Sequence, residues 1–190
     1  MRRRGKGQNM LKLERFAIED IPRLISWVPS QPEMIQWTGH FFQWPLQENE
    51  MAEHYRTTLG SNPRCFAFRA RRLRDEQIVG HIELDLIDYK NYYASLARVL
   101  VMPPERSKGI GSAMVDLVVR LAFTRLPLQT LGLNVVSFNL AAIACYRRIG
   151  FLPAGNSTTS YMIGEKQWMV NQMVLQKRDW MARRNRGLET

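Results

Sequence analysis

Apolar positions between residues 96 and 122 follow two different periods, one typical of a strand and one typical of a helix. Residues 96–102 form a short apolar run interrupted only by Arg98, and the two prolines that follow cannot extend a strand ladder. After two glycines, apolar side chains recur at the i, i+3, i+4, i+7 spacing of a helix that buries one face. The apolar positions of this helix are Ile110, Met114, Leu117, Val118, Leu121 and Ala122. The stretch is therefore predicted to be a strand, a glycine-containing turn and a helix.

The rest of the chain repeats these two patterns between Pro and Gly breaks. The predicted strands are 11–18, 65–71, 77–86, 94–102, 131–137, 151–156 and 167–176, and the predicted helices are 19–28, 47–59, 110–126 and 139–150. Asn139 stands where a helix N-cap is expected, and Gly150 where a helix end is expected. A mostly antiparallel front half followed by a parallel central pair of strands predicts the α+β class.

The composition is that of an ordinary globular protein with one domain. The 190 residues are 45% hydrophobic and 23% charged. Cys65 and Cys145 have no metal or redox spacing, so we expect a reduced cytoplasmic protein with no disulfide and no metal. Residues 126–146 carry no charge but contain several polar side chains, which favours a buried strand and helix over a membrane span. The first residues are basic without an apolar core, so no secretory signal is predicted.

The net charge of +10 is concentrated at the two ends of the chain. Residues 1–8 contain four basic residues and no acid, and residues 177–190 contain five basic and two acidic residues. We expect a disordered basic arm at 1–8, a single domain at 9–178 and a basic tail at 179–190. Basic ends are usually solvated. The alternative is a nucleic-acid or ribosome-binding module that contacts RNA through them, with an affinity that falls linearly with log salt.

The turn before the helix at 110–126 reads Arg106-Ser-Lys-Gly109-Ile-Gly111. A glycine loop at a helix start leaves backbone N–H groups without partners and lets an anion approach the main chain. A dinucleotide fingerprint would need a third glycine where Met114 stands and an acid about 20 residues later, and a P-loop pattern does not occur. An anion site of another kind is indicated.

This loop resembles the acyl-CoA pyrophosphate loop of the GNAT superfamily of N-acetyltransferases. A second span resembles the family's other cofactor segment, in which Asn, Ala, Tyr and a closing Gly-Phe stand at the offsets of Asn139, Ala142, Tyr146 and Gly150-Phe151. The two matches occur in the family's order, and the resemblance covers roughly residues 76–176. It implies a GNAT fold and acetyl-CoA as the co-substrate.

The resemblance also implies where acetyl-CoA binds. The strands at 94–102 and 131–137 would splay into a V that holds it, with the pantetheine arm along 99–101 and the amide of Leu100 near the thioester carbonyl. Backbone amides from 108–112 and the side chain of Arg106 would hold the pyrophosphate. The implied cofactor-binding residues are Val99, Leu100, Val101, Arg106, Ser107, Lys108, Gly109, Ile110, Gly111, Ser112, Asn139, Ala142 and Tyr146.

Tyr146 is the predicted proton donor to the thiolate leaving group. Asn139, Ala142, Ile143 and Tyr146 fall on one stripe of a helix, so an amide and a phenol can face the same ligand. A phenol has a reference pKa of about 10, above that of about 8.5 for a thiol, so it is protonated at neutral pH and is predicted to hydrogen-bond to the developing thiolate and reprotonate it. Cys145 lies off this stripe, and we expect direct attack in a ternary complex without an acyl-enzyme.

Glu83 is the predicted general base for the amine. Its strand is expected to lie beside the strand that carries the thioester, so its carboxylate could take the ammonium proton directly or through water. His81 and Asp85 share its face of the strand at period 2 and are rivals. Asn134 or Ser137 could position a water instead.

The acceptor is predicted to be a primary amine, either a protein N-terminus or a small molecule. The resemblance extends to the branch with ribosomal-protein N-terminal and small-amine acetyltransferases, and the sequence does not choose between them. The aromatic-rich residues 31–46 are interpreted either as core or as a wall of the acceptor pocket. No membrane partner is expected. A homodimer and a weak contact with RNA or the ribosome through the basic ends are left open.

Overall fold

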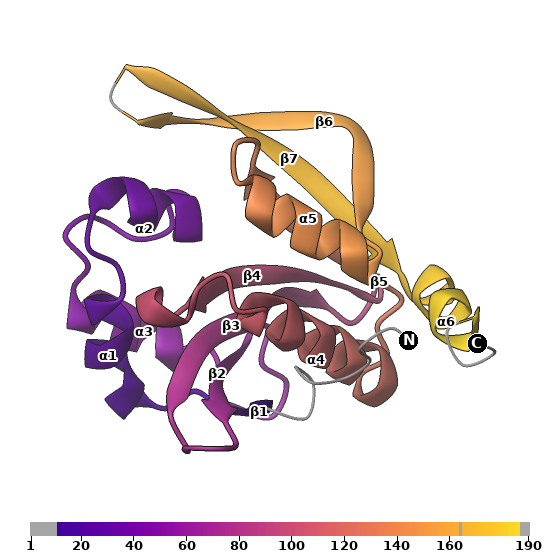
Figure 1. Cartoon of the computed structure of the whole chain (residues 1–190), viewed down its shortest axis with the longest axis horizontal. Helices are drawn as coiled ribbons and strands as arrows, with labels where there is room; N and C mark the ends of the chain where they lie inside the picture. The colour runs from indigo at the N-terminus through magenta and orange to yellow at the C-terminus, as the bar shows by residue number, and fades with distance from the viewer. Residues whose placement is uncertain (1–10, 164, 187–190) are drawn as a thin grey trace.

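The computed structural model describes residues 11–163 and 165–186, so the predicted basic arm at 1–8 lies outside the described residues. A seven-stranded sheet runs through the molecule, with helices on both faces (Figure 1). The strands are β1 (Leu11–Arg15), β2 (Phe66–Arg72), β3 (Ile78–Asp88), β4 (Tyr93–Val101), β5 (Thr130–Val136), β6 (Leu152–Ile163) and β7 (Lys166–Gln176). The helices are α1 (Ile21–Ser26), α2 (Gln31–Thr38), α3 (Glu48–Arg56), α4 (Ile110–Arg125), α5 (Leu140–Ile149) and α6 (Lys177–Arg186), with short 3-10 turns η2 (Ile18–Asp20) and η3 (Pro103–Glu105).

The strand order is β1-β2-β3-β4-β5-β7-β6. The central pair β4 and β5 is parallel, and the other neighbouring pairs are antiparallel. The predicted α+β class with a mixed, mostly antiparallel sheet is therefore confirmed. The parallel pair arises because α4 carries the chain from the end of β4 back to the start of β5.

Two hydrophobic cores lie on the two faces of the sheet. The first packs α4 and part of α5 against β3 and β4, and the second packs α1, α2 and α3 against the opposite face. The close approach of α4 to β3 depends on Gly80, because a Cβ there would lie 2.2 Å from the sulfur of Met114. The Gln31–Leu46 segment supplies side chains to the second core, which includes Met34, Trp37 and Phe42.

Some element ends differ from the predictions. The helix predicted at 19–28 ends at Ser26, and a separate helix, α2, follows it, with Pro32 in its first turn, where a missing N–H costs nothing, and Ser30 as its N-cap. Residues 179–186 of the predicted basic tail belong to α6. Its Trp180 is only 6% exposed and packs against Phe123 with ring centroids 5.4 Å apart. This aromatic contact anchors α6 to the first core.

The uncharged stretch 126–146 forms β5 and most of α5, as its polar residues predicted. Among the described residues, no helix combines the length and the apolar character that a membrane crossing requires.

Candidate active site

β4 and β5 pair only at their first three residues, Tyr93–Ser95 with Thr130–Gly132. β4 then continues to Val101 and β5 to Val136 without further pairing between them. This is the predicted V-shaped splay. It leaves one edge of the second half of β4 open to an extended ligand, which can pair with the strand backbone.

β4 carries a bulge at Arg98. Glu83 lies opposite Ala97 and His81 opposite Leu100, so β4 has one residue more than β3 between these pairs. Arg98 has a φ of 48°, which is uncommon for a residue other than glycine. The bulge exchanges the faces of the strand. The residues that pack against the first core are Ala94 and Leu96 before the bulge and Val99 and Val101 after it, while Leu100 lies in the second core.

The loop from Arg106 to Gly109 is exposed and leads directly into α4. Ser107 and Gly109 both have left-handed backbones, with φ of 63° and 82°. The N-cap Gly109 has no side chain, and the first backbone N–H to bond back into the helix is that of Ala113, 3.1 Å from the Gly109 carbonyl oxygen. The amides of residues 110–112 are therefore available to an anion.

The side chain of Arg106 lies beside this loop. Both of its terminal nitrogens are 3.1 Å from one carboxylate oxygen of Glu33 on α2, and its Nε donates to the Val101 carbonyl at 3.3 Å. The Arg106 side chain is 42% exposed. Because an exposed ion pair of this kind contributes little free energy, Arg106 is free to turn toward a stronger anion.

Tyr146 is buried on the inner face of α5. The helix begins at Asn139, whose side-chain oxygen accepts the backbone N–H of Ala142 at 3.2 Å, as its capping position predicted. Tyr146 is 8% exposed, and its ring packs edge-on against Phe151 with centroids 6.0 Å apart. Burial, with a smaller effect of Cys145, raises the pKa of the phenol, so Tyr146 keeps its proton.

The two predicted cofactor segments meet between α4 and α5. The hydroxyl of Ser112 donates to the sulfur of Cys145 at 3.1 Å. Burial raises the pKa of Cys145, so the thiol form is favoured over the nucleophilic thiolate.

Glu83 lies in a buried cluster of polar groups. Its carboxylate receives the Arg98 Nε at 2.7 Å, the His54 Nε2 at 2.8 Å, the His81 Nε2 at 2.9 Å and the Cys65 thiol at 3.2 Å. Burial alone would raise the pKa of Glu83. The positive charge of Arg98 and the hydrogen bonds from the two histidines outweigh burial and hold the pKa well below its usual value.

Arg98 connects this cluster to the bulge. A second guanidinium nitrogen pairs with Asp85, so the predicted rivals His81 and Asp85 both join Glu83, one directly and one through Arg98. The ligand atoms of His54, Cys65 and Glu83 lie within 4.8 Å of one another. Arg98 occupies the same carboxylate oxygen as His54, so a metal ion there would face a neighbouring positive charge.

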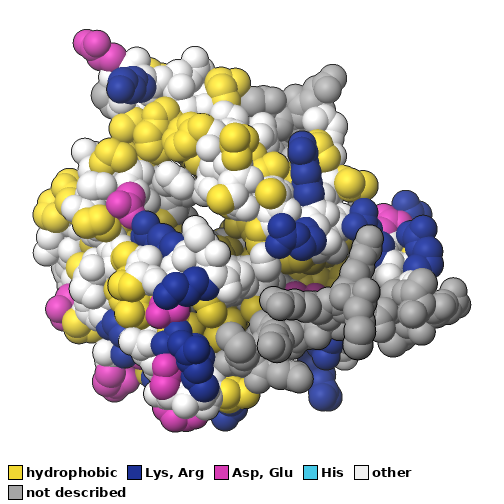
Figure 2. All heavy atoms as spheres, in the orientation of Figure 1, with side chains coloured by type: hydrophobic (Ala, Val, Ile, Leu, Met, Phe, Trp, Pro, Cys, Tyr) yellow, Lys and Arg dark blue, Asp and Glu magenta, His cyan; other side chains and the backbone are white. Residues whose placement is uncertain are grey.

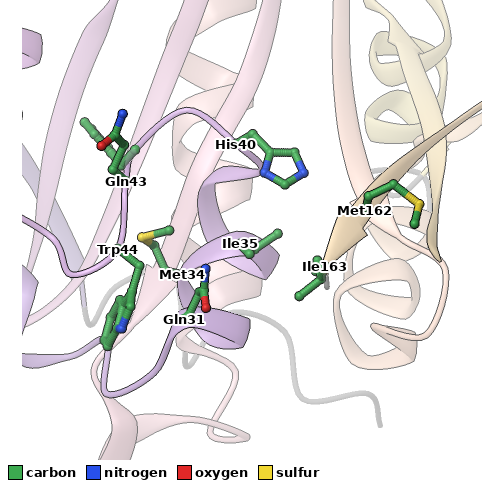
Figure 3. Close-up of a pocket in the computed structure, with 9 residues that line it drawn as sticks. Gln31, Met34, Ile35, His40, Gln43, Trp44, Met162 and Ile163 are labelled. Atoms are coloured by element: carbon green, nitrogen blue, oxygen red, sulfur yellow. The ribbon is translucent and has the colours of Figure 1, made fainter. Parts of the chain in front are cut away.

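A pocket of about 290 Å³ lies between α2, the loop that follows it and the β6–β7 hairpin (Figure 3). Its apolar lining is Met34, Ile35, Phe42, Trp44, Met162 and Ile163, and its polar lining is Gln31, His40 and Gln43. Ile163 reaches from β6 toward Ile35 and His40 on the opposite wall. The space-filling view shows a hollow beside the hairpin, with hydrophobic side chains above it (Figure 2). Residues 31–46 thus contribute both to the second core and to the lining of a pocket, and the assignment of this pocket to the acceptor stays a prediction.

The Glu83 cluster lies behind the aromatic wall of this pocket. Phe42 lines the pocket, and its ring centroid is 5.7 Å from that of His54. Phe41 covers the Arg98 guanidinium at 4.6 Å. Of the water-positioning candidates, Asn134 is exposed on β5, and the backbone N–H of Ser137 donates to the Met169 carbonyl at 2.8 Å.

Three polar residues of this region were missed by sequence reasoning. Arg98 interrupts an apolar strand, which was a usable signal for a buried ion pair. His40 and His54 lie in the N-terminal half of the chain and gave no signal, because their partners Tyr161 and Glu83 are distant in sequence.

A family model described as "Acetyltransferase (GNAT) family" matches residues 31–151, which span β4, the loop from Arg106 to Gly109 and α5. The chain belongs to this family. It is therefore an acetyl-CoA-dependent N-acetyltransferase, and a binding module without turnover is not favoured.

Solved structures of GNAT enzymes share this fold. A spermidine N-acetyltransferase from Vibrio cholerae, in complex with CoA and spermine, is 19% identical, with a TM-score of 0.79 over 91% of this chain and 99% of that chain. A dodecameric form of spermidine N-acetyltransferase from Vibrio cholerae, described as an intermediate state, is 20% identical, with a TM-score of 0.75 over 92% of this chain and 98% of that chain. At this identity the likeness is one of fold.

Proposed function

We propose that this GNAT enzyme transfers the acetyl group of acetyl-CoA directly to a primary amine, with acetyl-CoA in the V between β4 and β5 and the amine in the pocket beside α2. The observation that carries the proposal is the open edge of β4, because it runs from the parallel pair to an exposed loop with available helix amides. The pocket adjoins the same strand, since Leu100 packs in one core with Met34, Ile35 and Phe42.

The residues of the V fit the parts of acetyl-CoA. The amides at the start of α4 and the Arg106 guanidinium suit a pyrophosphate. At Gly111 a Cβ would lie 3.6 Å from the Val101 side chain, so the first turn of α4 is close to the end of β4. The free edge of β4 at 99–101 suits the amides of a pantetheine arm. The N–H of Met102 donates to Val79 on β3, so with the alternation of backbone groups the N–H of Leu100 also faces β3, while those of Val99 and Val101 face the V. One of these two amides, on either side of Leu100, is the proposed donor to the thioester carbonyl oxygen.

In the reaction, the amine nitrogen forms a bond to the thioester carbonyl carbon and the carbon–sulfur bond breaks, with its electron pair leaving on sulfur. One proton leaves the amine for a base. The Tyr146 phenol is proposed to stabilise the thiolate by donating a hydrogen bond. Full proton transfer from Tyr146 is uphill, because burial raises the pKa of the phenol further above that of a thiol.

Two side chains are proposed as the base. Glu83 is held ionised but is 2% exposed and engaged by four donors, whereas the His40 imidazole lines the pocket itself. The acidic limb of the rate profile against pH distinguishes them, since the limb disappears with the residue that acts as the base. If it persists in both Glu83→Gln and His40→Gln, a water positioned by Asn134 or Ser137 takes the proton.

The test is release of CoA thiol from acetyl-CoA with a panel of amines and peptides. We expect turnover with at least one acceptor class. Tyr146→Phe should lower kcat by about 10- to 100-fold with little change in the KM for acetyl-CoA, because it removes one hydrogen bond to the leaving group. Tyr92→Phe, at an exposed turn, is the matched control and should behave as the wild type. Absence of thiol release with every amine would contradict the proposal.

Self-association is also proposed. One solved neighbour is described as a dodecamer. In this chain, large apolar side chains are exposed on the β6–β7 hairpin and on the turn before α5, which supports an interface there. These are Phe138 on the turn, Leu140 at the first residue of α5, and Met162 and Met169 on the hairpin.

A further inference from the structure

The pocket beside α2 carries no negative charge among the described residues that line it. Its polar groups are two amides and one imidazole, from Gln31, Gln43 and His40, and the rest of its lining is apolar. Methionine and tryptophan side chains make up much of this apolar lining, and methionine adapts readily to flat or branched apolar ligands. The volume of about 290 Å³ is at the lower end of the range for small-molecule sites.

Four carboxylates on the elements around the pocket have partners of their own in this structure. Glu33 on α2 faces the guanidinium of Arg106 at 3.1 Å. Glu50 accepts the backbone N–H of Gln43 at 3.2 Å. Glu83 and Asp85 are both bound to Arg98, behind the aromatic wall. None of these four carboxylates lines the pocket, so a cationic group of a ligand inside it would not meet them directly.

A polyamine would be poorly accommodated by this lining. Besides the amine that reacts, a polyamine carries at least one more ammonium group, and an ammonium group that loses water needs a carboxylate or several acceptors in its place. The protein as a whole carries a net charge of +10, which repels polycations at a distance. A single amine that gives up its proton before attack leaves no charge behind in the pocket.

We propose that the acceptor is a small primary monoamine whose amino group is attached to an apolar or aromatic body, and that polyamines are poor substrates. This assignment of substrate class rests on the proposed function. The body would pack between Met34 and Ile35 on one wall and Ile163 on the other, with Trp44 beside them, while the amino group points toward the open edge of β4. The spermidine enzymes that share the fold would then differ from this chain in the lining of the pocket.

The first experiment compares kcat/KM in the thiol-release assay for phenethylamine, tryptamine, ethanolamine, putrescine, spermidine and a short peptide with a free N-terminus. We expect phenethylamine and tryptamine to exceed spermidine and putrescine by about tenfold or more, equivalent to about 1.4 kcal/mol in transition-state binding. Ethanolamine should also be poor, because it has the single amine but no apolar body.

The second experiment adds a carboxylate to the pocket. Gln31→Glu preserves the shape of an exposed side chain in the first turn of α2, where an acid is favourable. It should raise the ratio of kcat/KM for spermidine to that for phenethylamine by about fivefold, because it supplies the missing partner. Gln36→Glu makes the same change at an exposed position of α2 outside the pocket and should leave the ratio unchanged.

Each other outcome counts against the inference. Spermidine turnover at or above that of phenethylamine, or equal turnover of ethanolamine and phenethylamine, would overturn the substrate class while leaving N-acetyl transfer intact. Turnover of the peptide alone would replace the small molecule by a protein N-terminus. An unchanged ratio of kcat/KM for spermidine to that for phenethylamine in Gln31→Glu would show that the acceptor amine does not bind in this pocket. Absence of thiol release with every acceptor would overturn the proposed function itself.

Discussion

Glu83 and Arg98 form an ion pair that is almost fully removed from solvent, with side-chain exposures of 3% and 6%. Two charges in such a site are tolerated because both the carboxylate and the guanidinium have several hydrogen-bond or ion-pair partners. Glu83 receives two histidines and a thiol besides Arg98, and Arg98 also reaches Asp85. Among the described residues, the Nδ1 of His81 has no hydrogen-bond partner, and its Nε2 donates to Glu83. The pair holds the bulge of β4 against β3.

Replacing Glu83 by Gln should lower the free energy of unfolding by about 3–5 kcal/mol at pH 7, because the buried Arg98 loses its main counter-charge. The folded pKa of Glu83 lies well below the unfolded value of about 4.3, so its contribution is complete above that pH and declines as pH falls through the folded pKa. The difference between wild type and Glu83→Gln should therefore narrow below about pH 4. Urea denaturation at pH 7, 5 and 3.5 measures it.

Glu33→Gln is the control, because it breaks the exposed pair with Arg106 and should change stability by less than about 1 kcal/mol. An equal loss in both variants would contradict a special role for the buried pair.

The start of α4 and the end of β4 act together as one element of the site. The left-handed backbones at Ser107 and Gly109 turn the chain so that the first helix amides point to solvent beside the splay. Ser112 then ties α4 to α5 through Cys145. The loop from Arg106 to Gly109 is thus anchored where it enters α4, although its own side chains are exposed.

Arg106→Gln should raise the KM for acetyl-CoA by about tenfold and leave kcat within about threefold, because an exposed guanidinium contributes to binding of the pyrophosphate and not to the chemical step. Steady-state kinetics with acetyl-CoA as the varied substrate measures this. Glu33→Gln releases Arg106 from its present partner, so its KM for acetyl-CoA should equal or fall below that of the wild type. A raised KM in Glu33→Gln, or an unchanged KM in Arg106→Gln, would remove Arg106 from the pyrophosphate site.

On the scale of the whole molecule, several large exposed apolar side chains lie in one region of the surface, near the β6–β7 hairpin. Lys and Arg side chains are scattered over the face in Figure 2, and hydrophobic side chains gather near the β6–β7 hairpin. Met162 on β6 and Met169 on β7 are 54% and 42% exposed and lie diagonally opposite each other on one face of the hairpin. Large apolar side chains exposed together on one surface are typical of an interface.

We expect the protein to form dimers or larger assemblies in solution through this surface. Sedimentation velocity at several protein concentrations measures the association. Met169→Glu should weaken it by about tenfold or more, because a carboxylate would be buried without a partner in the interface. Leu73→Glu, at an exposed leucine in the β2–β3 turn, is the matched control and should not alter it. A wild-type protein that sediments as a monomer at all concentrations would contradict the expectation.

Local patterns in the sequence were sufficient to predict α4, the glycine loop at Arg106–Gly111 that precedes it and the cap of α5. They also predicted the succession of strands and helices along the chain, from which the α+β class follows. They did so because helix periodicity, capping and glycine conformations depend on residues within a few positions of one another. The two motif spans were sufficient for the family, since each is contiguous.

Contacts between distant segments were decided by the folded chain. The pocket joins residues 31–44 to 162–163, and the ion cluster joins His54 and Cys65 to Glu83 and Arg98. Which side of β4 a residue faces depends on the bulge at Arg98, which shifts the period-2 pattern by one. These contacts are set by the pairing of strands that are far apart in the sequence. A local sequence pattern does not predict them, because it depends only on residues within a few positions of one another.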